Sequence, residues 1–124
     1  MKKIVVIAIL FLLYSCKKEE PKKENLYPEI AQTPEQLGKE IYEGKGNCIG
    51  CHQPEEKVIG PSIQEIATLY KAKNANMVAF LKGEAEPIVD PAQYEVMKTN
   101  FAITKTMSDE ELKALEAYFY SFAK

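Results

Sequence analysis

The apolar residues of this chain recur at helical spacing from residue 33 onward. Leu37, Ile41 and Tyr42 fall on one face of the first such stretch. Just before them, residues 33–36 read Thr-Pro-Glu-Gln, which supplies both residues of a capping box and a proline in the first turn. We therefore predict a helix that begins after Thr33 and runs to about Gly44.

Three further stretches carry the same periodicity. Residues 63–71 and 76–82 predict two helices, the second ended by Gly83, and a second capping box at residues 108–111 begins a C-terminal helix. The residues expected to face inward are Ile63, Ile66, Ala67, Tyr70, Leu112, Leu115, Phe119 and Phe122. No segment alternates apolar and polar residues as a strand would. The pattern therefore predicts one all-α domain of about four to five short helices over residues 33–124.

The first 15 residues have a different pattern, which is typical of a bacterial lipoprotein signal peptide. Two lysines precede an apolar run from Ile4 to Tyr14, which is too short to span a bilayer but suits a signal peptide. Residues 13–16, Leu-Tyr-Ser-Cys, resemble a lipobox, although Tyr14 replaces the usual small or branched residue. We expect cleavage before Cys16 and lipid attachment to its thiol, with an uncleaved membrane anchor as the alternative. Both interpretations predict export.

Residues 16–32 are rich in charge and contain two prolines. Such a composition cannot bury a core, so we expect a flexible tether between the lipidated Cys16 and the folded domain. The chain has 16 basic residues, all lysine, against 18 acidic ones, and removal of Lys2 and Lys3 leaves a net charge of about −4. Because nucleic-acid-binding proteins need a basic surface, this charge favours a protein partner with a basic patch instead.

The segment Cys48-Ile49-Gly50-Cys51-His52 carries the chemistry of the chain, because C-x-x-C-H is the attachment sequence of c-type haem. Two thiols on one turn of backbone can each add to a vinyl group of one porphyrin, and the next imidazole can reach its iron. A zinc site would need four ligands, and only three remain once Cys16 is assigned to lipid attachment. A thioredoxin-like dithiol would need a βαβ unit, which the pattern does not contain. Haem is the favoured interpretation, and these two alternatives stay open.

The opposite face of a haem iron has fewer candidate ligands. His52 is the only histidine, so Met, Lys, water or an open position remains. Met77 lies in the third predicted helix, where a core position is the simpler explanation. Met107 adjoins the predicted N-cap Ser108, and Met97 lies in a predicted loop after the turn at residues 90–94. The residues alone leave the three methionines open.

Together these features resemble class I cytochrome c, the small monohaem family, over nearly the whole of residues 33–124. Gly38 and Tyr42 match the family's Gly-x-x-x-aromatic pattern. In that pattern the glycine lets the C-terminal helix cross closely. The resemblance makes Leu115 and Tyr118 the expected counterparts on that helix.

The resemblance also implies roles for residues around the haem. Gly60-Pro61 follows the C-x-x-C-H segment at a distance similar to the family's Gly-Pro. By resemblance, the Pro61 carbonyl accepts a hydrogen bond from the haem-ligating His52 and orients its ring. The family usually places its axial methionine in a loop before the C-terminal helix, which implies Met97, with Met107 and then Met77 as alternatives.

The function implied by the resemblance is single-electron transfer rather than catalysis. The expected protein is a small domain around one covalent c-type haem, anchored by lipid at Cys16 and facing the periplasm or the cell surface. We expect a monomer that exchanges electrons with redox partner proteins. The alternative is a haem-based gas sensor or weak peroxidase, in which the position opposite His52 is open.

Overall fold

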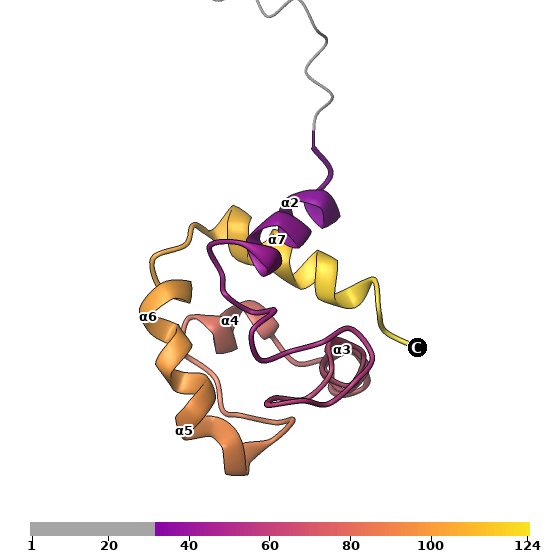
Figure 1. Cartoon of the computed structure of the whole chain (residues 1–124), viewed down its shortest axis with the longest axis vertical. Coiled ribbons are helices and arrows are strands. Elements are labelled where there is room, and N and C mark those ends of the chain that lie inside the picture. The colour runs from indigo at the N-terminus through magenta and orange to yellow at the C-terminus, as the bar shows by residue number, and fades with distance from the viewer. Residues whose placement is uncertain (1–31) are drawn as a thin grey trace, which may run out of the picture. The chain divides into compact units, whose positions relative to one another are not determined.

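The structure is a computed structural model that describes residues 32–124. Within this range the chain is helical and contains no strand, which confirms the predicted all-α class (Figure 1). The predicted signal peptide, the tether and Cys16 lie outside the described residues. None of the described helices is long and apolar enough to cross a membrane.

Both predicted capping boxes are present, and they set the starts of the two helices that cross in the upper part of Figure 1. Helix α2 (Pro34–Glu43) begins after Thr33, whose hydroxyl accepts from the Gln36 amide at 3.2 Å while the Gln36 side chain accepts from the Thr33 amide at 3.0 Å. Helix α7 (Asp109–Tyr120) begins in the same way after Ser108. These reciprocal bonds satisfy backbone donors that the first turn of a helix leaves free.

The two middle helices also match the prediction closely. Helix α3 (Ile63–Lys73) extends two residues beyond the predicted end. It stops there because Asn74 adopts a left-handed conformation, with φ at 48°, and its amide bonds back to carbonyls of the last turn. Helix α4 (Met77–Leu81) is capped by the side chain of Asn76 and is followed by Gly83, whose φ is 73°.

The segment before α7 differs from the prediction. Residues 91–104 form four short helical turns in succession where a loop was expected. The prediction that Met97 lies in a loop is therefore wrong, because Met97 is the last residue of a short helix. The turns are η2 (Pro91–Gln93), α5 (Tyr94–Met97), η3 (Lys98–Asn100) and α6 (Phe101–Thr104). Turns of three or four residues are unstable alone, so contacts elsewhere must support them. Here the buried Thr104 hydroxyl donates to the Leu81 carbonyl at 2.6 Å.

Helices α2 and α7 pack at a crossing that only glycine allows. A Cβ atom at Gly38 would overlap the carbonyl group of Ala114 and come within 2.7 Å of the Tyr118 Cβ. The close crossing and the role of Tyr118 are therefore as predicted. The second contact of Gly38 on α7 is with the backbone of Ala114 and not, as predicted, with Leu115. Leu115 lies in the core instead, with 1% exposure.

The core lies where α2, α3 and α4 pack against α7. Its buried residues include most of the positions predicted to face inward. The buried cluster consists of Ile41, Tyr42, Cys48, Ile63, Ile66, Tyr70, Met77, Leu81, Met107, Leu112, Ala114, Leu115 and Phe119. Cys48 is part of this cluster, so the helical scaffold holds the start of the C-x-x-C-H segment directly.

Candidate haem site

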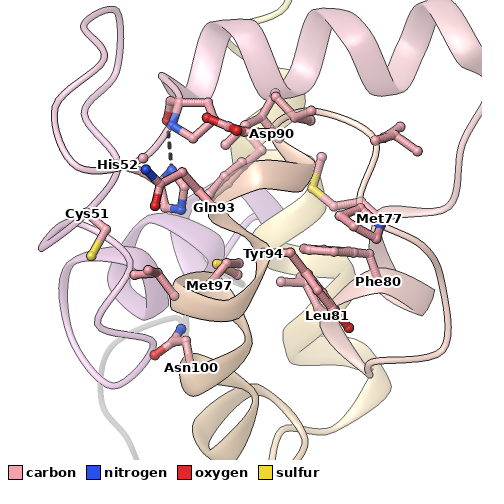
Figure 2. A pocket seen from close by; sticks show the side chains of 18 of the residues that line it. Cys51, His52, Met77, Phe80, Leu81, Asp90, Gln93, Tyr94, Met97 and Asn100 are labelled. Atoms are coloured by element: carbon pink, nitrogen blue, oxygen red, sulfur yellow. Dashed lines mark hydrogen bonds between the residues drawn. The ribbon is translucent and has the colours of Figure 1, made fainter.

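An open pocket lies beside the C-x-x-C-H segment. The loop that contains Cys51, His52 and Pro61 forms one wall, and the short helical turns of residues 91–100 contribute to another. Figure 2 shows how side chains from these walls point into the same space. Most of the lining is apolar or aromatic, which is typical of cofactor sites.

The two cysteines lie on a single turn of backbone, as their spacing predicts. The amides of Cys51 and His52 both donate to the Cys48 carbonyl, at 3.1 and 2.9 Å. Cys51 is partly exposed and lines the pocket, whereas Cys48 is buried. Both are free thiols. The motif therefore carries two unpaired thiols three positions apart, and that of Cys51 lies at the pocket.

The acidity of Cys48 bears on the dithiol alternative. Burial, with a smaller contribution from Cys51, raises the pKa of Cys48 to about 11. A dithiol oxidoreductase depends on a lowered thiol pKa, because the thiolate is the nucleophile. The environment of Cys48 raises its thiol pKa instead of lowering it, which argues against a dithiol oxidoreductase.

His52 is buried and is held in one tautomer. Its Nδ1 atom lies 2.7 Å from the Pro61 carbonyl oxygen. Since a carbonyl can only accept, Nδ1 must carry the hydrogen, and the lone pair of a neutral ring is then on Nε2. Burial lowers the pKa of His52, and the bond to Pro61 offsets part of this effect. A neutral imidazole with a free Nε2 is the form that binds iron.

The structure explains why a glycine precedes Pro61. A Cβ atom at Gly60 would lie 2.6 Å from Cε1 and 2.8 Å from Nδ1 of His52. The Gly60 amide also donates to the Cys51 carbonyl at 2.8 Å. The backbone of Gly60 is therefore packed against the imidazole ring, and this close approach brings the next carbonyl within reach of Nδ1.

The methionines occupy three different environments. Met97 is partly buried at the end of α5 and lines the pocket (Figure 2). Met77 also lines the pocket, but it belongs to the core and is 3% exposed. Met107 is 8% exposed in the core cluster, and it is not one of the residues that line this pocket. Four of the expected site residues thus lie around one cavity: Cys51, His52, Pro61 and Met97. Cys48 is on the same backbone turn as Cys51 but does not line this pocket.

Two polar contacts that hold the walls of the site together were not predicted from the sequence. The Asn100 amide group donates to the Gly46 carbonyl at 3.0 Å and joins the turns of residues 91–104 to the cysteine loop. Lys57 forms an ion pair with Asp90 at 3.0 Å and joins the loop before Gly60 to the start of η2. Neither pair is visible in the sequence, because the partners are 54 and 33 positions apart.

The donor set fits a c-type haem better than a metal ion bound by side chains alone. Among residues 32–124, no group of three or more His, Cys, Asp and Glu side chains is arranged to hold a metal ion. A porphyrin would supply four iron ligands itself, so the protein needs only one imidazole and one further ligand. The apolar walls, the two thiols and the unprotonated Nε2 satisfy those requirements.

Comparisons with known proteins agree with this assignment. Residues 35–122 match the family model of cytochrome c. Cytochrome c-552 of Nitrosomonas europaea is 45% identical over 40 residues, which are 32% of this chain and 38% of that protein. The aligned part is thus well under half of that relative, whereas the family match covers most of this chain. The chain therefore belongs to the cytochrome c family, as a small all-α protein of class I whose cofactor is a covalently bound c-type haem.

Proposed function

We propose that this protein is a single-electron carrier whose haem is attached through Cys48 and Cys51 and ligated by His52 and Met97. The observation that supports this most directly is the hydrogen bond from His52 to Pro61, which leaves Nε2 free beside a pocket that Met97 also lines. When bound, the haem supplies an iron that alternates between two oxidation states.

The proposed ligands suit electron transfer. A thioether is soft and uncharged, so Met97 would favour Fe(II) over Fe(III) and raise the reduction potential. Gly60 and Pro61 would hold the ring of His52 in place through both oxidation states. Two permanent ligands keep the structural change on electron transfer small.

The proposal includes no substrate turnover. His52 is the only histidine of the chain, so a peroxidase-type mechanism would lack a second histidine as the distal acid and base. The partners would be an electron donor and an electron acceptor protein. The net charge of about −4 after removal of the expected signal peptide would favour a partner with a basic surface.

The proposal extends to location. The apolar run before Cys16 and the lipobox-like residues around it support export and lipid attachment at Cys16. The charged residues 17–32 would then act as a tether that lets the haem domain reach partners at the membrane. Members of the cytochrome c family are typically periplasmic or exported, which is consistent with this location.

Substitution of the methionines tests the ligand assignment. Met97→Leu keeps the approximate volume and removes the sulfur, so we expect loss of the weak red absorption band that marks a ferric Met–iron bond. The midpoint potential should fall, and carbon monoxide should bind quickly to the opened position. Met77→Leu is the matched control, because it makes the same change at another pocket methionine.

The outcomes separate the alternatives. Loss of the band in Met77→Leu but not in Met97→Leu would assign the ligand to Met77. A wild-type protein that is high-spin and binds carbon monoxide quickly would favour the gas sensor or peroxidase. A protein without covalent haem on a denaturing gel stained for haem peroxidase activity would contradict the whole proposal.

A further inference from the structure

Tyr42 makes a contact that its place in the helix crossing does not require. Its ring packs against Tyr118 and Phe119 of α7, with centroid distances of 5.3 and 6.1 Å. Its hydroxyl donates a 2.5 Å hydrogen bond to the main-chain carbonyl of His52. Both residues are buried, with 2% and 9% exposure. Packing explains an aromatic residue at this position, but phenylalanine would supply the packing equally well.

The bond from Tyr42 is one of three that hold His52 from different parts of the chain. The His52 amide donates to the Cys48 carbonyl at 2.9 Å, and its Nδ1 donates to the Pro61 carbonyl at 2.7 Å. The Tyr42 hydroxyl fixes the third polar group, the main-chain oxygen. It is the one of the three that connects His52 to a helix outside the haem-binding loop.

We propose that the Tyr42 hydroxyl is a positioning group for His52, which it orients toward the iron and toward Pro61. This inference rests on the proposed role of His52 as a haem ligand. The ring of Tyr42 is held by α7, so the place of its hydroxyl follows from the α2–α7 crossing. The His52 peptide is held by that hydroxyl, and the peptide in turn determines how well Nδ1 meets the Pro61 carbonyl.

The chemical consequence concerns the electron density of the imidazole. A strong hydrogen bond from Nδ1 makes the ring a better donor to iron and favours Fe(III). Without the Tyr42 hydroxyl, the His52 peptide would lose one of its attachments, and the bond from Nδ1 to Pro61 would lengthen. The ring would then donate less, and the midpoint potential would rise.

The test uses Tyr42→Phe in the full-length, haem-loaded protein, with Tyr118→Phe as the matched control. Tyr118 is in the same aromatic cluster and loses the same atom, but its hydroxyl is not bonded to His52. The first readout is the exchange of the His52 Nδ1 proton with deuterium, followed by NMR. We expect it to be faster by roughly tenfold in Tyr42→Phe, the factor that loss of one net hydrogen bond produces. The second readout is the midpoint potential, which should be higher than in the wild type.

A general loss of stability must be separated from a local effect. The backbone amide of Leu115, a buried residue in the middle of α7, serves as an internal reference, because amides at the centre of a core helix exchange mainly when the whole fold opens. The proposal holds if Nδ1 exchange accelerates more than Leu115 exchange and the midpoint potential rises, while Tyr118→Phe changes neither the Nδ1 exchange nor the potential. It is overturned if the two protons accelerate equally, if the potential is unchanged, or if Tyr42→Phe binds no haem. Failure of the proposed electron-carrier function gives a different result from failure of the Tyr42 proposal, because the wild type itself would then lack a low-spin covalent haem.

Discussion

The environment of His52 is set by neighbouring residues that have no reactive groups of their own. Gly60 allows the backbone to lie against the imidazole ring, and the Pro61 carbonyl accepts from Nδ1. The result is a neutral ring with its lone pair on Nε2. The chemistry of the site therefore depends on the absence of a side chain at position 60 as much as on the histidine itself.

Substitution of Gly60 should disturb the haem directly. Gly60→Ala would place a Cβ atom 2.6 Å from Cε1 of His52, so the ring must move away from its position. We expect a fall of several-fold in the yield of low-spin haem protein, measured by the absorption spectrum and by haem staining. The ring is the ligand itself, so the spectrum should change even in the fraction that folds.

Gly50→Ala is the matched control, because it adds the same methyl group inside the C-x-x-C-H segment. Its Cβ atom would lie 3.7 Å from the nearest atoms, which is ordinary contact. We expect a wild-type spectrum and yield. If the two variants behaved alike, contact with the His52 ring would not be the reason for glycine at position 60.

At the scale of elements, the crossing of α2 and α7 determines where the haem-binding loop begins. The crossing is close because Gly38 has no side chain where it meets the backbone of Ala114. Tyr42, one turn later, then reaches both α7 and the His52 carbonyl. The glycine and the tyrosine of one short helix thus connect the packing of the scaffold to the site.

Gly38→Ala tests the crossing. Alanine favours a helix over glycine by about 1 kcal/mol, so an exposed position would gain stability. At Gly38 the new methyl group would overlap the Ala114 carbonyl group and force the helices apart. We expect a net loss of about 1–3 kcal/mol in the free energy of unfolding, measured by urea denaturation of the haem protein. Lys39→Ala, at an exposed neighbour, should change it by less than about 0.5 kcal/mol, and a stabilised Gly38→Ala would refute the close crossing.

At the scale of the whole molecule, the folded protein should be less stable in mild acid. Burial lowers the pKa of His52 below its ordinary value of 6.5. As the pH falls through 6.5, the histidine of the unfolded chain takes up a proton that His52 in the folded chain does not, so the free energy of unfolding decreases. An iron-bound nitrogen takes up no proton either, so haem ligation acts in the same direction.

Urea denaturation at about pH 7.5 and about pH 5.5 measures this effect. One group can contribute at most about 1.4 kcal/mol per pH unit, and His52 is the only histidine. Hydrogen bonds from lysines lower the pKa of Asp90, Asp109 and Glu111, so their contribution is lost only in a separate, more acidic range. Equal stability at the two pH values would show that His52 is not held as a buried neutral ring.

Local features of the sequence determined much of this fold. The capping residues at 33–36 and 108–111 set the starts of α2 and α7, because the side chain and the backbone donor that it satisfies are three positions apart. The C-x-x-C-H segment identified the cofactor because its reactive residues, Cys48, Cys51 and His52, are likewise close together in the sequence. The presence of a single histidine is enough to exclude a second histidine ligand from the same chain.

Only the tertiary structure decided the features that depend on distant partners. Residues 91–104 are helical because contacts such as those of Thr104 with Leu81 and Asn100 with Gly46 support turns that are too short to form alone. The bond from Tyr42 to His52, the contact of Gly38 with Ala114, and the presence of both Met97 and Met77 at one pocket likewise arise from packing. The resemblance carried by Gly38 and Tyr42 predicted that two helices cross closely, but the atoms that meet there are set by how the helices pack in space, and no periodicity along the chain encodes them.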